Sequence, residues 1–317
     1  MKYRGLGKTG LEVSEIGFGA WAIGGDAYGP TSDMDSSAAL EKAWEKGVNF
    51  YDTADSYGKG HSETLIGRFL KGKPREKIFI ATKAGWDFYR DPVKKRFDAE
   101  YIGFACERSL ARLDTDYADL FQLHNPSLAL IESGEAADVL GSLKKSGKVR
   151  FTGLSVHRME EARAALRFSE IDTLQIVFNI LDQRMSAVFE EAAGKGVGLI
   201  IREPLASGLL TGKYGSKHEF PKGDHRRRWI AEKRTLDEQK LTLIRDRIPG
   251  AEWPKTALEF VLAERFVASV IPGMKTSSQV MDNLRASSQT EISQDQIQML
   301  RGLFWDAAIF QQGLNPS

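Results

Sequence analysis

Residues 48–58 (VNFYDTADSYG) place polar side chains directly after an apolar stretch. Val48, Phe50 and Tyr51 are typical of a buried strand, and Asp52 and Tyr57 follow at its end. Polar side chains in such a place either bind the backbone of a turn or line a site. A phenol can donate a proton, and a carboxylate can hold a cation beside it, so this pair could take part in proton transfer.

The elements that would position these residues are short apolar runs that alternate with longer amphipathic segments. Each run is rich in Val, Ile, Leu or Phe, as strands buried on both faces are. Residues 98–113 predict a helix that begins after an Asp cap, and residues 33–47 predict another that ends at Lys and Gly. The eight predicted strands are residues 15–21, 48–54, 77–85, 117–125, 150–156, 173–180, 197–206 and 267–273.

Eight alternating strand–helix units predict a parallel sheet, and in a chain of 317 residues they favour a closed (β/α)8 TIM barrel. The alternative is a doubly wound sheet, which would need a GxGxxG segment after its first strand. Residues 17–25 (GFGAWAIGG) lack that spacing. The first 14 residues predict an N-terminal β-hairpin with its turn near residues 7–10. We expect residues 1–317 to form a single barrel domain.

A barrel brings four titratable residues to one end, because its active sites lie at the carboxyl ends of the strands. Lys83 and His124 end the third and fourth predicted strands, beside the strand that carries Asp52 and Tyr57. Any one of them alone is more often a structural group. Four together at adjacent strand ends favour a site.

Composition limits the function classes. The chain has 44 basic and 43 acidic residues, a net charge of +1, so nothing calls for nucleic acid or a charged membrane as a partner. Its one cysteine, Cys106, excludes an internal disulfide and a multi-cysteine metal site, and His61 and His157 lack partners at metal-ligand spacing. No apolar run approaches the length of a membrane span, and the N-terminus lacks the apolar block of a signal peptide. We therefore expect a cytoplasmic protein.

Several segments together resemble the aldo-keto reductase family. Residues 47–63 (GVNFYDTADSYGKGHSE) look like its first signature, and IATKAG with Lys83 and DLFQLHNP with His124 match the next two catalytic segments in order. GLSVH, QIVFN, REPLASGLLTGKY and IPGMKTSSQVMDN resemble its cofactor-binding segments. The resemblance extends over nearly the whole chain. It implies an oxidoreductase that reduces aldehydes or ketones with NADPH, with NADH as a possible substitute.

The four residues suit carbonyl reduction, because hydride transfer leaves negative charge on oxygen and requires a proton donor. Tyr57 would be that donor. An ammonium group at Lys83 would lower the pKa of the phenol, and Asp52 would keep Lys83 charged although it is buried. A neutral His124 would orient the carbonyl.

The resemblance also assigns a cofactor site. Ser155 and Gln175 would bind the carboxamide of the nicotinamide, and Arg202 would stack on its ring. Lys275 and Gln279, near a helix that Thr276 or Ser277 would cap, would lie at the 2'-phosphate, and Asn283 at the adenine. The remaining cofactor-binding residues that it implies are Pro204, Leu205, Gly208, Lys213 and Gly273.

Other residues have more than one interpretation. Trp21 and Trp86, with Phe88 and Tyr89, could line a substrate pocket beside His124. Residues 222–229 (KGDHRRRW) could fold over the pyrophosphate or form a solvated basic loop. We expect Asp55 to bind turn backbone, Glu63 to cap a helix, and Cys106 to be an ordinary buried thiol, and we expect no metal site.

Two other functions stay open on the same scaffold. One is a cofactor-binding regulatory protein that resembles the potassium channel beta subunits. Slow or absent turnover despite tight cofactor binding would favour this alternative. The other is an aldolase-like or isomerase-like enzyme that forms a Schiff base on Lys83, which trapping by borohydride would reveal. The expected partner is a small carbonyl substrate, and the expected assembly is a monomer or a small homo-oligomer.

Overall fold

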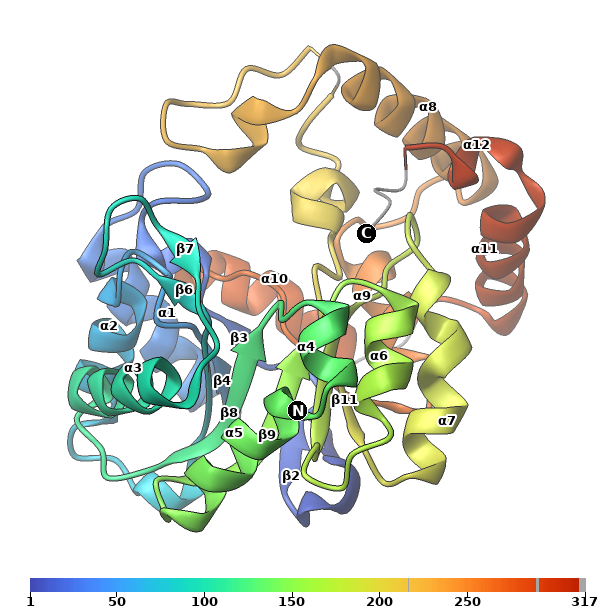
Figure 1. The fold of residues 1–317 in the computed structure, drawn as a ribbon. Coiled ribbons are helices and arrows are strands. Elements are labelled where there is room, and N and C mark those ends of the chain that lie inside the picture. The colour runs from blue at the N-terminus through green and yellow to red at the C-terminus, as the bar shows by residue number, and fades with distance from the viewer. Residues whose placement is uncertain (216, 289–290, 314–317) are drawn as a thin grey trace.

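The computed structural model describes residues 1–215, 217–288 and 291–313. Its centre is a sheet of eight strands in which all neighbours are parallel and follow one another in chain order (Figure 1). Seven of the strands lie inside the runs predicted from the sequence, and β9 begins one residue before its run at 150–156. The strands are β3 (Phe18–Gly19), β4 (Phe50–Asp52), β5 (Phe79–Ala84), β8 (Ala118–His124), β9 (Val149–Ser155), β10 (Thr173–Val177), β11 (Gly198–Arg202) and β12 (Val267–Val270).

The two ends of this sheet meet, which closes it into a barrel. Parallel bridges pair Ile16 with Val270 and Gly19 with Gly273. Beside them, the N–H of Gly17 donates to the carbonyl of Val270 at 2.8 Å. A Cβ atom on Gly19 would lie only 2.6 Å from the carbonyl oxygen of Ile271, so only glycine lets the chains approach this closely. The predicted (β/α)8 barrel is confirmed.

Helices surround the barrel (Figure 1). The predicted helix at 98–113 is α3 (Ala99–Leu113), whose N-cap Asp98 accepts a hydrogen bond from the N–H of Tyr101 at 3.0 Å. The predicted helix at 33–47 is α1 (Asp33–Glu45), which Ser32 caps. The other helices are α2 (His61–Leu70), α4 (Leu128–Glu132), α5 (Glu135–Lys145), α6 (Met159–Ala165), α7 (Phe189–Gly194), α8 (Ala231–Arg247), α9 (Lys255–Leu262), α10 (Ser277–Ser288), α11 (Gln294–Asp306) and α12 (Ala308–Gln311).

The predicted N-terminal hairpin covers the end of the barrel opposite to the carboxyl ends of the strands. It pairs β1 (Tyr3–Gly5) with β2 (Glu12–Ser14) and turns through residues 7–10, as predicted. The N–H of Lys8 donates to the carbonyl of Gly196 at 2.6 Å, just before β11. Leu6, Leu11 and Val13 pack inside the barrel against residues of several strands. The opposite end of the barrel is therefore the one that holds the cavity described below.

Arg4, in β1, joins the hairpin to the last strand–helix unit. Its guanidinium donates to the carbonyl oxygens of Leu262, Glu264 and Val267 at 2.7, 3.2 and 3.0 Å, and it pairs with Glu15. These carbonyls lie at the end of α9, in the connection after it and at the start of β12, so the hairpin is bound to the last strand of the barrel.

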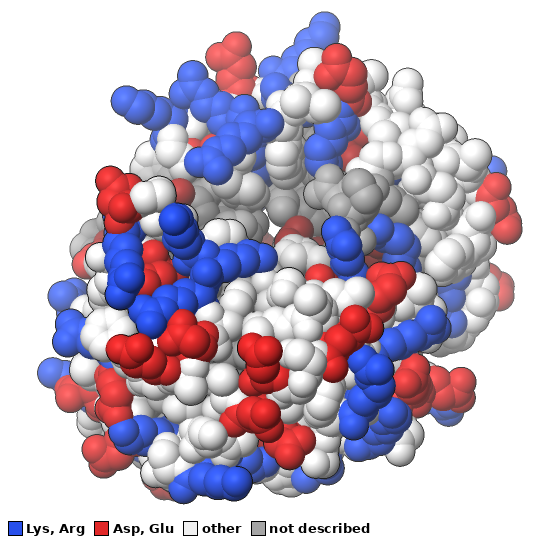
Figure 2. Space-filling model, viewed as in Figure 1, with Lys and Arg blue, Asp and Glu red and all other residues white. Residues whose placement is uncertain are grey.

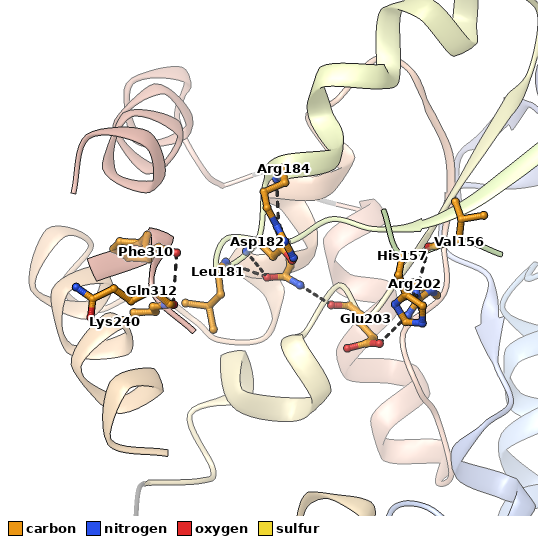
Figure 3. Close-up of polar contacts among 11 residues, drawn as sticks. Val156, His157, Leu181, Asp182, Arg184, Arg202, Glu203, Lys240, Phe310 and Gln312 are labelled. Carbon is orange, nitrogen blue, oxygen red and sulfur yellow. Dashed lines mark hydrogen bonds and ion pairs between the residues drawn. The ribbon is translucent and has the colours of Figure 1, made fainter. Parts of the chain in front are cut away.

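Long connections lie over the carboxyl ends of the strands. The hairpin of β6 (Trp86–Asp87) and β7 (Lys94–Lys95) follows β5. Short 3-10 turns at Ala206–Thr211 and His225–Arg228 follow β11 and lead to α8. On α8, the ammonium of Lys240 donates to the carbonyl of Gln312 at 2.7 Å, which ties the segment after α12 to this helix (Figure 3).

None of the helices in the described part of the chain has the length and apolar character needed to cross a bilayer.

Candidate active site

The four residues predicted to be catalytic lie together at the carboxyl end of the barrel. Asp52 ends β4, Lys83 lies near the end of β5, His124 ends β8, and Tyr57 follows in the loop after β4. The Nζ atom of Lys83 lies 2.7 Å from Oδ1 of Asp52 and 3.5 Å from the hydroxyl of Tyr57. The ring of His124 meets the ring of Tyr57 edge-on at 5.9 Å.

Asp52 is held from three directions. Besides Lys83, Nε2 of Gln175 donates to its Oδ2 at 2.6 Å, and Nε2 of Gln122 approaches the same oxygen at 3.5 Å. The carbonyl oxygen of Thr53 accepts a second hydrogen bond from Lys83 at 2.7 Å. A buried ammonium with a carboxylate and a carbonyl as partners is well satisfied. Gln122 was not predicted from the sequence as a site residue. A polar residue within a buried strand (DLFQLH) was the signal that could have identified it.

Burial dominates the titration of the site. It lowers the pKa of Lys83, and the carboxylate of Asp52 acts against this. It raises the pKa of Tyr57, and the charge of Asp52 raises it further, whereas Arg202 lowers it. This direction is opposite to the one expected from the sequence, because burial of the phenol and the charge of Asp52 outweigh the nearby cation Arg202. Burial and the nearby cations hold the pKa of His124 well below its ordinary value, so its ring is neutral.

A cavity of about 820 Å³ opens at this end of the barrel and includes Asp52, Tyr57 and His124 in its wall. The predicted substrate residues Trp21 and Trp86 line it as well, and Trp21 stacks on Tyr57 with 5.8 Å between ring centres. Ser155 and Lys83 are not among the lining residues. The predicted cofactor-binding residues that do line the cavity are Gln175, Arg202, Pro204, Leu205, Gly208, Lys213, Gly273, Lys275, Gln279 and Asn283.

Arg202, at the end of β11, is fixed by its neighbours (Figure 3). One nitrogen of its guanidinium donates to Glu203 at 2.8 Å, and another donates to Nδ1 of His157 at 2.7 Å and to the carbonyl of Val156 at 3.2 Å. Burial and the charge of Arg202 lower the pKa of His157 to about 3, so this imidazole accepts the hydrogen bond as a neutral ring. The guanidinium is thus held at the cavity wall.

Lys275 is directed toward another loop of the cavity. Its Nζ donates to the carbonyl oxygens of Tyr28 and Pro30 at 2.9 and 3.1 Å. Thr276 accepts a hydrogen bond from the N–H of Gln279 at 3.3 Å, which makes Thr276 the cap of α10. The side chain of Gln279 accepts from the N–H of Lys275 at 2.9 Å.

The side chains of the basic segment 222–229 differ in their exposure to solvent. Arg226 turns inward, pairs with Asp224 at 2.6 Å, and packs against the rings of Tyr28, Tyr214 and Phe220. His225 stacks on Trp21 with 4.9 Å between ring centres. Arg227 and Arg228 are exposed. Part of the segment therefore covers the cavity, and part is a solvated basic loop.

One of the other expectations is wrong. Glu63 does not cap α2, since its carboxylate accepts from Thr82 at 2.5 Å and pairs with Arg112 at 2.7 Å. The buried carboxylate of Asp55 lies against the backbone of Ser56, in the turn that follows it, and this backbone contact acts to lower its pKa, although no hydrogen bond of normal geometry from a described residue reaches either oxygen. Cys106 is a buried thiol as expected, and burial raises its pKa to about 12.

No group of three or more His, Cys, Asp or Glu side chains arranged to hold a metal ion occurs among the described residues.

Comparison with known proteins agrees with this geometry. The family model "Aldo/keto reductase family" matches residues 15–304. The chain is 30% identical to the L-galactose dehydrogenase of Arabidopsis thaliana over 98% of this chain and 99% of the relative. It is 29% identical to the NADH-specific methylglyoxal reductase of Escherichia coli over 90% and 93%.

A solved structure is similar over the same extent. The holo form of the aldo-keto reductase AKR11C1 from Bacillus halodurans superposes with a TM-score of 0.80 and 31% identity, covering 96% of each chain. The chain belongs to the aldo/keto reductase family, whose members are NAD(P)H-dependent oxidoreductases that act on carbonyl groups.

Proposed function

We propose that this protein is an NADPH-dependent reductase that converts aldehydes and ketones to alcohols, with Tyr57 as the proton donor. The observation that carries the proposal is the chain of contacts from Asp52 through Lys83 to the hydroxyl of Tyr57, at 2.7 and 3.5 Å, which ends in the wall of the cavity. His124, whose ring faces Tyr57, completes the set.

The residues of this chain handle the proton. When bound, a reduced nicotinamide supplies a hydride to the carbonyl carbon, and negative charge develops on the oxygen. Tyr57 gives that oxygen its phenolic proton. An alkoxide is a stronger base than a phenolate, so a phenol with a raised pKa still donates to it. The ammonium of Lys83 then stabilises the phenolate, and Asp52 keeps the ammonium charged.

His124 orients the carbonyl before the transfer. Its neutral ring lies at the cavity beside Tyr57, so an N–H of the imidazole can donate to the same oxygen that receives the proton. Because the pKa of His124 is held low by burial and by surrounding cations, the ring does not compete with Tyr57 as the acid.

The wall of the cavity suits the cofactor. Its volume, about 820 Å³, lies in the upper part of the range of roughly 300–1,000 Å³ for small-molecule sites. In this proposal Arg202 stacks on the nicotinamide, and Gln175 binds the carboxamide together with Ser155, which is buried and does not line the cavity in this structure. The amide nitrogen of Gln175 already donates to Asp52, which leaves its oxygen for this role. Pro204, Leu205, Gly208, Lys213 and Gly273 surround the middle of the cofactor.

The preference for NADPH rests on the start of α10. Lys275 supplies a positive charge, and the N-terminus of α10 supplies oriented N–H groups for a 2'-phosphate. Gln279 lies beside them, and Asn283 faces the adenine. In the present structure the donors of Lys275 are used by the carbonyls of Tyr28 and Pro30, so phosphate binding requires Lys275 to exchange these partners.

The proposal includes the setting of the reaction. Residues 1–317 act as one (β/α)8 oxidoreductase domain in the cytoplasm, on a small carbonyl substrate, as a monomer or a small homo-oligomer. The single cysteine agrees with a reducing compartment.

A panel of aldehydes and ketones with NADPH and with NADH tests the proposal, with the loss of nicotinamide absorbance as the measurement. We expect turnover that depends on the carbonyl compound and is faster with NADPH. Tight binding of the cofactor without turnover of any carbonyl would instead favour the regulatory alternative.

A further inference from the structure

The hairpin of β6 and β7 forms one rim of the cavity through Trp86, and Lys95 is an exposed residue of this hairpin that does not itself line the cavity. Its Nζ donates to the carbonyl oxygen of Asn125 at 2.8 Å and lies 5.2 Å from the centre of the ring of Trp86. Asn125 directly follows His124 in the sequence. Trp86, His124 and Asn125 all line the cavity. The ammonium of Lys95 is therefore anchored next to the catalytic histidine.

Lys95 carries a charge that no carboxylate neutralises. It forms no ion pair with any acid in the described ranges 1–215, 217–288 and 291–313. Glu161 is the acidic residue that acts on its titration, and that carboxylate accepts from the backbone N–H groups of His157 and Arg158 at 3.0 Å each. An ammonium has three N–H donors, and the carbonyl of Asn125 takes one of them. Two donors remain for a ligand.

The other basic groups near His124 are already paired or neutral. Lys83 is bound to Asp52, Arg202 is bound to Glu203, and His157 is uncharged because its pKa is about 3. Among the basic groups that act on the titration of His124, Lys95 is the one that is neither paired with a carboxylate nor a neutral ring. Figure 2 shows basic side chains gathered on the rim of the central hollow where Figure 1 draws the β6–β7 hairpin.

We infer that the carbonyl substrate carries an anionic group, a carboxylate or a phosphate, and that Lys95 binds it. The inference rests on the proposed reductase function and adds the substrate class. The carbonyl group would lie at Tyr57 and His124, and Lys95 is anchored to the residue after His124. The two ends of the substrate are therefore a few bonds apart. Trp86, under the ammonium, supplies an apolar surface for the atoms between them.

The test compares two aldehydes that differ in charge, para-carboxybenzaldehyde and its methyl ester, with NADPH. We expect kcat/KM of the wild type to be higher for the acid by about tenfold, as for one charge-assisted contact. Lys95→Met should lower the ratio of acid to ester by about tenfold, through KM of the acid. Lys95→Arg should keep most of the preference.

Lys94→Met is the matched control. Lys94 is the other residue of β7, and because side chains alternate along a strand it points to the opposite face of the hairpin. The substitution Lys94→Met removes the same charge from the same strand as Lys95→Met. A general effect of charge would therefore appear in both variants. We expect the ratio to stay at its wild-type value in Lys94→Met.

A binding measurement separates this inference from the proposed function. Para-(hydroxymethyl)benzoate has no carbonyl to reduce, and its binding can be followed by tryptophan fluorescence, since Trp21 and Trp86 line the cavity. Binding that Lys95→Met weakens would support the anion site even if no aldehyde were turned over, which would overturn only the proposed function. An acid-to-ester ratio or an affinity that Lys95→Met leaves unchanged would overturn the inference.

Discussion

Lys83 donates a hydrogen bond of 2.7 Å to Asp52 inside the barrel, and both side chains are almost completely buried. A buried ammonium loses its proton easily unless a carboxylate holds the charge. Here the carboxylate has Gln175 as a further donor, which keeps it in place. Burial lowers the pKa of Lys83 and raises that of Asp52, and the ion pair between them acts against both shifts. The pair thereby favours the charged lysine, which is the form that supports a phenolate and the wrong form for attack on a carbonyl.

Lys83→Met should abolish carbonyl reduction without removing a covalent intermediate. The variant leaves Asp52 buried without its partner, so a loss of roughly 3 kcal/mol in the free energy of unfolding is expected as well. Circular dichroism verifies that the variant is folded before its activity is compared. Mass spectrometry of the wild type after borohydride treatment with substrate should show no adduct. An adduct mapped to Lys83 would favour the Schiff-base alternative.

Tyr57→Phe should remove nearly all reduction and leave the affinity for the cofactor almost unchanged. The ring remains, with its stacking on Trp21, and only the proton donor is lost. The measurements are kcat with chemistry rate-limiting and the Kd of NADPH by fluorescence quenching. A variant that kept more than about a tenth of the wild-type kcat would show that another group is the acid.

Lys275→Ala should weaken the binding of NADPH by roughly 1–3 kcal/mol, the range for a charge-assisted contact, and should affect NADH little. The Kd of both cofactors for wild type and variant is the measurement. Lys275 also holds the carbonyls of Tyr28 and Pro30, so a loose loop would weaken both cofactors alike. Equal losses would assign Lys275 to the loop, and no loss would place the phosphate elsewhere, for example at residues 226–228.

Asp55→Asn should raise the melting temperature at neutral pH. Burial, and after it the charge of Glu63, raise the pKa of Asp55 well above its ordinary value. An acid whose pKa is higher in the folded state binds protons more tightly there, so it costs stability once the pH exceeds the unfolded pKa of about 3.9. Asn removes this cost.

The gain from Asp55→Asn should shrink as the pH falls, because below about pH 4 the carboxyl is neutral in both states. Thermal unfolding followed by circular dichroism at several pH values measures it. The control is Asp116→Asn, at an exposed position, which should change the melting temperature little at every pH. A loss of stability in Asp55→Asn at neutral pH would mean that the charged form of Asp55 is needed.

Most of the framework could be predicted because its signals are local. The alternation of apolar runs and amphipathic segments gave all eight strands, and the cap at Asp98 gave the start of α3. The grouping of Asp52, Lys83 and His124 followed from one rule, that the strand ends of a barrel meet. That rule requires only the order of the strands.

The details that the sequence did not reveal depend on distances between remote segments. Gln122 reaches Asp52 only through the register of β8 and β4 on either side of β5, and Glu63 finds Arg112 on another helix. The pKa of Tyr57 depends first on how deeply the phenol is buried and then on its position relative to Asp52 and Arg202. No spacing in the sequence encodes these differences, since each arises from packing between elements.

The contacts of Arg4 and of the barrel seam have a consequence for synthesis on the ribosome. Residues 4 and 16–19 bind residues 262–273, so these segments are made long before the segments that they bind. Before residues 262–273 have been made, the apolar side of the hairpin and one edge of β3 have no partner. Exposed apolar surface and an unpaired strand edge favour aggregation of the nascent chain. A ribosome-bound intermediate should therefore be an open sheet that begins at β3, and the closure of the barrel should coincide with the release of β12.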